Sequence, residues 1–118
     1  MNQDNQKSSP SGEDLGGASA PAVPILVIGR HPEILATVVR LVNNNPAWNA
    51  TGCQTDDEAI QAFDAQRFTL VLLGGGIPPE SENRLSQYFR NCKPDIRIVQ
   101  HYGGGSGLLA AEIYEALR

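Results

Sequence analysis

The sequence predicts an α/β protein in which a parallel sheet is covered by helices on both faces. Short apolar runs at residues 25–28 and 70–73 are each followed directly by glycine, and a third, mostly apolar segment at residues 96–99 leads to glycines that begin at Gly103. Continuous apolar runs of this length are typical of strands that are buried on both faces. Segments with helical periodicity separate them, and strands alternating with helices imply right-handed crossovers between parallel strands. We therefore expect a three-layer fold with about four helices.

The first half of the predicted domain contains two strands and two helices. After the strand at residues 25–28, Pro32 and Glu33 suit the first turn of a helix. The side chains that this helix should turn inward are Ile34, Leu35, Val38, Val39, Leu41 and Val42. A short strand at residues 48–53 follows. Thr55 and Glu58 then form a capping-box pattern, which predicts a helix that extends to about Gln66.

The second half repeats this alternation. A strand is expected at residues 68–73 and a helix at residues 81–91, with Leu85, Tyr88, Phe89 and Cys92 on one face. The fourth strand should cover residues 96–100. The last helix should extend through Leu117, with Leu109, Ile113, Ala116 and Leu117 inward.

Length and charge limit the classes of protein to consider. The chain has 118 residues, a net charge of −4 and a pI near 5.0. Residues 1–22 are polar and are expected to be a disordered tail, so one domain remains at residues 23–118. Without clustered basic residues or a long apolar segment, neither nucleic acid nor membrane is an expected partner. With no secretory signal pattern at the N-terminus, a cytoplasmic location is expected, and Cys53 and Cys92 should be reduced thiols in or near the core.

Two segments of the sequence resemble the response-regulator receiver domain. Residues 25–34 are similar to the opening strand and helix of that family, which normally read I-L-V-V-D-D-E-P-E-I. Residues 69–78 are similar to its third strand, D-L-V-L-L-D-x-x-M-P. The resemblance covers roughly residues 24–102 and the final helix, and it implies a flavodoxin-like or receiver-like fold. Only thirteen residues follow Gly105, which is too few for the missing helix and strand, so we expect a shortened sheet of four strands in the order 2-1-3-4.

The functional residues of the family are absent from the matching positions. Its Mg²⁺-binding acidic pair falls on Gly29 and Arg30, and its phosphoacceptor aspartate falls on Gly74. Phosphoryl transfer to a receiver requires a carboxylate nucleophile and a metal ion. We therefore expect a pseudo-receiver that is not phosphorylated, is not an enzyme, and holds neither a metal nor another cofactor. The leading interpretation is a signalling or regulatory module that acts by binding a protein partner or itself.

The alternative is a sensor for a small anion or nucleotide at the glycine-rich edge of the sheet. Carboxyl ends of parallel strands lie on one rim, and glycine-rich turns before a helix expose amides to anions. We take Arg30 as the source of positive charge. The candidate ligand-binding residues are Gly29, Arg30, His31, Gly74, Gly75, Gly76, His101, Gly103, Gly104, Gly105, Ser106 and Gly107. The glycines after the fourth strand have an equally simple explanation, since the chain must turn sharply there.

Loss of the fifth strand also predicts a homodimer. The fourth strand becomes a sheet edge, and unprotected apolar edges tend to pair with other chains. The candidate edge residues are Ile96, Arg97, Ile98 and Val99. Dimerisation through a face that the missing helix leaves uncovered, around Leu85, Tyr88 and Phe89, is the other possibility.

Overall fold

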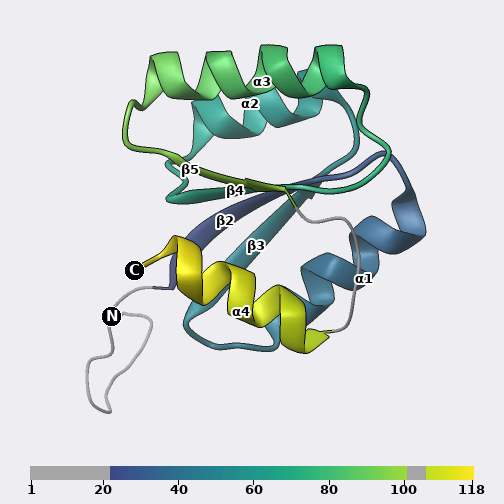
Figure 1. Cartoon of the computed structure of the whole chain (residues 1–118), viewed down its shortest axis with the longest axis vertical. Helices are drawn as coiled ribbons and strands as arrows, with labels where there is room; N and C mark the ends of the chain where they lie inside the picture. Colours follow the sequence, from purple (N-terminus) through teal and green to yellow (C-terminus); the bar gives the residue numbers. More distant parts are fainter. Residues whose placement is uncertain (1–21, 101–105) are drawn as a thin grey trace, which may run out of the picture.

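The computed structural model describes residues 22–100 and 106–118, which form alternating strands and helices (Figure 1). In chain order the elements are β2 (Val23–Ile28), α1 (Pro32–Asn43), β3 (Trp48–Cys53), α2 (Asp56–Ala65), β4 (Leu70–Leu73), α3 (Pro79–Cys92), β5 (Arg97–Gln100) and α4 (Ser106–Ala116). Residues 1–21 and 101–105 lie outside the described residues. The predicted tail and the candidate site residues His101, Gly103, Gly104 and Gly105 therefore stay predictions.

The described strands form one parallel sheet in the order β3-β2-β4-β5. This is the predicted order 2-1-3-4, with β2 and β4 at the centre. All residues of β4 and the last four of β2 are buried, as expected for strands that are covered on both faces. The fold class, the sheet order and the four helices are confirmed.

Helices cover the sheet in pairs. Helices α2 and α3 lie on one face, and α1 and α4 lie on the other (Figure 1). The alternation of side chains along β4 divides the core accordingly, because Val71 and Leu73 pack toward α2 and α3 whereas Leu70 and Leu72 pack toward α1 and α4. Three aromatic rings fill the half of the core that lies between the sheet and helices α2 and α3. The ring centroids of two of them, Phe63 and Phe89, are 4.5 Å apart.

The helix starts follow from local chemistry. Pro32 opens α1. At α2, the Thr55 hydroxyl accepts a hydrogen bond from the Glu58 amide at 3.1 Å, and the Glu58 carboxylate accepts one from the Thr55 amide at 3.4 Å. The predicted capping box is confirmed. Helix α3 is longer than expected at both ends, because Pro79 fits the first helical turn and was wrongly excluded from the helix.

Three expectations about exposure are wrong. Ile34 is 60% exposed although it was placed inward, because the first turn of α1 extends past the rim of the sheet. Cys92 is exposed at the end of α3, whereas Cys53 is buried as expected. Leu85 and Phe89 are fully buried, because α3 packs on the sheet and beside α2. The face around them is therefore not an uncovered surface.

None of the helices in the described residues is long and apolar enough to cross a membrane.

Candidate functional site

The carboxyl ends of β2 and β4 meet at the centre of the rim. Gly29 donates its amide hydrogen to the Cys53 carbonyl oxygen at 3.0 Å, and Gly74 donates to the Ile28 carbonyl oxygen at 2.7 Å. A Cβ on Gly74 would lie 3.1 Å from that same Ile28 oxygen and 3.7 Å from the Gly29 Cα. The two glycines therefore bring the strand ends into close backbone contact.

The loop after β4 also depends on glycine. Gly76 has a φ of +84°, a conformation that side-chain-bearing residues rarely adopt. Gly75 has open space where a Cβ would be built, with nothing within 4 Å. The loop is thus constrained at Gly76 and accessible at Gly75.

An ion-pair network crosses the rim from β2 to α3. Arg30 donates from Nη1 to the Gln54 carbonyl oxygen at 2.7 Å, and its Nη2 bonds to Oδ1 of Asp56. Arg84 of α3 bonds to the other oxygen of the same carboxylate. The Asp56 side chain is only 11% exposed, compared with 29% for Arg30 and 66% for Arg84. Asp56, the first residue of α2, therefore ties the loop between β2 and α1 to helix α3.

The electrostatics of this network favour a charged Asp56. Partial burial raises the pKa of the Asp56 carboxyl, but hydrogen bonds from Arg30, Arg84 and Ser81 outweigh that effect, so the pKa lies below its ordinary value. The guanidinium of Arg30 is thus ion-paired, but the single carboxylate of Asp56 is shared with Arg84, so two positive groups face one negative group and the network stays net positive. The expected role of Arg30 in ligand binding stays a prediction.

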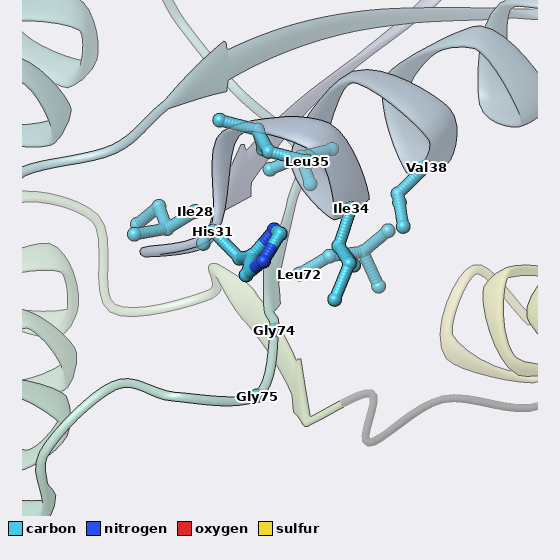
Figure 2. A pocket seen from close by; sticks show the side chains of 10 residues that line it. Ile28, His31, Ile34, Leu35, Val38, Leu72, Gly74 and Gly75 are labelled. Carbon is cyan, nitrogen blue, oxygen red and sulfur yellow. The ribbon is translucent and has the colours of Figure 1, made fainter.

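A small apolar pocket lies beside the glycines, between the start of α1 and the ends of β2 and β4. The side chains of His31 and Ile34 extend from α1 toward it, and Gly75 lies at its edge (Figure 2). Leu72 and Gly29 also line it. Its volume of about 20 Å³ is enough for roughly one water molecule. Sites for drug-sized ligands measure about 300–1,000 Å³, so this pocket by itself accepts only a very small ligand.

The structure brings together half of the candidate ligand-binding residues. Gly29, His31, Gly74 and Gly75 line one pocket, and a Cβ on Gly76 would lie 3.8 Å from the Arg30 Cβ. Ser106 is the first residue of α4, with Gly107 in the same turn, and their part in ligand binding stays a prediction.

Donors for a metal ion do not gather in the described part of the chain. There, no group of three or more His, Cys, Asp or Glu side chains is placed to hold an ion.

Asp56 is the rim residue that sequence reasoning missed. We assigned the segment around it only to the capping of α2. A signal was present, because a helix that follows a parallel strand begins at the carboxyl end of the sheet. Asp56 was therefore bound to lie on the same rim as Arg30.

Comparison with known proteins identifies the fold. No family model matches the chain, and no curated protein matches its sequence. Solved structures do match. A response regulator receiver domain protein from Methanospirillum hungatei JF-1 is 16% identical with a TM-score of 0.61, over 80% of this chain and 75% of that one. A receiver protein from Pseudomonas putida is 18% identical with a TM-score of 0.61, over 83% and 82% of the two chains.

A third match is the non-phosphorylated receiver domain of the stress response regulator RcsB from Escherichia coli. It is 13% identical with a TM-score of 0.55, over 80% of this chain and 76% of that one. Identities this low establish the fold alone. The chain has a receiver-like fold, and the resemblance that we drew from residues 25–34 and 69–78 is confirmed at that level.

Proposed function

We propose that this receiver-like domain is a regulatory module that works without phosphorylation, by binding a protein partner or a second copy of itself. The observation that carries the proposal is Gly74. By resemblance it takes the place of the phosphoacceptor, and a Cβ there would already lie 3.1 Å from a backbone oxygen. A residue without a side chain has no nucleophile to receive a phosphoryl group.

The surroundings of Gly74 support the same conclusion. Gly29 and Arg30 replace the acidic pair, and Arg30 is bonded to Asp56 rather than turned toward a phosphoryl group. Asp56 itself is held by two arginines and lies at the start of α2. This donor set supports a non-enzymatic role, since the described residues offer no free carboxylate beside Gly74.

Incubation with acetyl phosphate and Mg²⁺ tests the proposal. We expect the intact mass of the chain to stay unchanged while an authentic receiver domain, treated in parallel, gains one phosphoryl group. Stoichiometric phosphorylation of this chain would contradict the assignment of Gly74.

The alternative function is a sensor of a small anion at the rim. It is supported by the accessible backbone of the rim, where Gly75 has open space beside it, and it predicts a rise in melting temperature with phosphate or nucleotides. Gly75→Val is the informative variant, because open space surrounds Gly75 and the new side chain would obstruct the rim without a clash. A saturable thermal shift that this variant abolishes would favour the sensor. No shift with phosphate, nucleotides or cyclic nucleotides would favour the interaction module.

A further inference from the structure

The side of β5 that faces away from β4 carries backbone groups with no strand partner among the described residues. Arg97 donates its amide hydrogen to the Thr69 carbonyl oxygen, on the β4 side, at 3.4 Å. The backbone N–H and C=O groups of successive residues point to opposite sides of a strand. Those of Arg97 and Val99 therefore face β4, whereas those of Ile98 and Gln100 face away from the sheet. Among the described strands, β5 has a neighbour only in β4. Ile96, which we expected in this edge, precedes the strand and is 7% exposed in the core, so it is not available to a partner.

A groove runs beside this edge, between β5 and α4. It measures about 440 Å³ and is lined by Val99 together with Ala111, Glu112, Glu115 and Ala116 of α4. The small alanine side chains leave Val99 only half-buried. The groove therefore offers an apolar floor with an acidic helix at its side, next to unpaired backbone.

The charges around the groove are complementary between two copies of the chain. Arg97 is exposed and alternates with Ile98, so it projects on the same face as Val99 and reaches the Arg118 carbonyl oxygen beyond α4 at 3.4 Å. Glu112 and Glu115 line the groove, and Glu115 also accepts a hydrogen bond from Arg118 of the same chain at 3.1 Å, in a pair that is exposed on both sides. An antiparallel partner strand would bring its own Arg97 toward these carboxylates as a further cation.

We propose that two copies of this chain associate through β5, in antiparallel register about a two-fold axis at Val99. In that register Ile98 of one copy pairs with Gln100 of the other, so all the outward backbone groups of both residues are bonded. Among the residues of β5 itself, any other register about a two-fold axis leaves some of them unpaired. The proposal deepens the proposed function, on which it rests, by naming the partner as a second copy of the chain.

The other edge of the sheet does not have these properties. β3 alternates buried residues with Asn49, Thr51 and the exposed Gly52. The outer surface of β3 is therefore polar, whereas β5 presents the apolar side chain of Val99. Asn49, an exposed residue on β3, therefore provides a matched control position.

Cysteine cross-linking tests the register. Across the two-fold axis the two Val99 residues form a non-hydrogen-bonded antiparallel pair, whose Cα atoms lie about 4.5 Å apart. That separation is within the range of about 4.4–6.8 Å for a disulfide. In a Cys92→Ser background, which removes the exposed native thiol, Val99→Cys should form a covalent dimer rapidly under mild oxidation. Asn49→Cys should not, and equal rates for the two variants would overturn the proposal.

Sedimentation velocity tests the association itself on the full chain. Because the interface is small, we expect dimers to form only at protein concentrations on the order of micromolar or higher. We also expect the association to be weaker in high salt. Gln100→Pro removes an outward amide that β4 does not use, and it should make the chain monomeric with an unchanged melting temperature. A monomer at near-millimolar concentration would overturn the dimer while leaving the proposed function intact. Phosphorylation by acetyl phosphate would overturn the function while leaving the dimer intact.

Discussion

The network around Asp56 makes a quantitative prediction about stability. Replacing Asp56 with asparagine keeps the shape of the side chain but removes the charge that holds Arg30 and Arg84. The bond to Arg30 is partly buried, and hydrogen bonds to charged groups contribute about 1.5–3 kcal/mol. The bond to Arg84 is largely exposed on the arginine side and adds less than about 1 kcal/mol. We expect the variant to lose about 2 kcal/mol of unfolding free energy.

Asp57→Asn is the matched control. Asp57 is exposed and lies next to Asp56 in the first turn of α2. Its replacement by asparagine removes the same charge from the same end of the helix. Helix-dipole effects of about 0.3–1 kcal/mol are therefore similar in both variants. The difference between them isolates the hydrogen bonds to the arginines. For a domain of this size, 2 kcal/mol corresponds to a melting temperature lower by about 8–16 °C.

The assay is thermal unfolding followed by circular dichroism over a range of pH. Because the pKa of Asp56 is lowered in the folded protein, its stabilisation is present above the unfolded pKa of about 3.9 and is lost as the pH falls through the folded value. The difference in melting temperature between the wild type and Asp56→Asn should therefore disappear in acid. Equal melting temperatures for the two variants at neutral pH, or a gap that persists in acid, would refute the reasoning.

Two further predictions concern packing and ionisation. Gly52→Ala places a Cβ 2.8 Å from Val39 Cγ2 of α1, so we expect a loss of about 1–3 kcal/mol in urea unfolding, whereas Gly75→Ala, with open space around it, should be neutral or slightly stabilising. Equal urea midpoints for the two alanine variants would contradict this expectation and show that α1 moves to accommodate the new methyl group. The hydrogen bond from the Tyr88 hydroxyl to the Asp64 carboxylate, at 2.7 Å, is the main reason that the pKa of Tyr88 is raised to about 12. Its stabilisation is present below the unfolded pKa of about 10 and is lost as the pH rises through 12. An NMR titration of Asp64→Asn should therefore show a lower phenol pKa, and an unchanged value would exclude this hydrogen bond as the cause.

Local patterns were sufficient for the elements of this fold. The buried runs at residues 25–28 and 70–73 and the capping box at Thr55 depend only on neighbouring residues, and each appears where it was expected. The order of strands followed from the crossover rule together with the receiver resemblance. Errors arose where a helix extends past the sheet, as at Ile34, because periodicity identifies the apolar face of a helix but not the point at which its cover ends.

The rim was predicted only in part. Which glycines end the strands, and the absence of a carboxylate from positions 29, 30 and 74, can be read directly from the chain. The compensation of Arg30 by Asp56 joins residues that are 26 positions apart. No local pattern contains such a pair.

By itself, the amino-acid sequence determined which residues stand at positions 29, 30 and 74 and how strands and helices alternate, because both depend on residue identity and short-range spacing. Tertiary structure alone decided what the remaining charged side chains do. Folding brings Arg30 from the loop after β2 and Arg84 from α3 to the carboxylate of Asp56 at the start of α2. It also places α4 beside β5, so that a groove borders the outer edge of the described sheet. Distances between residues remote in the chain are set by how the layers pack, and only the folded molecule contains them.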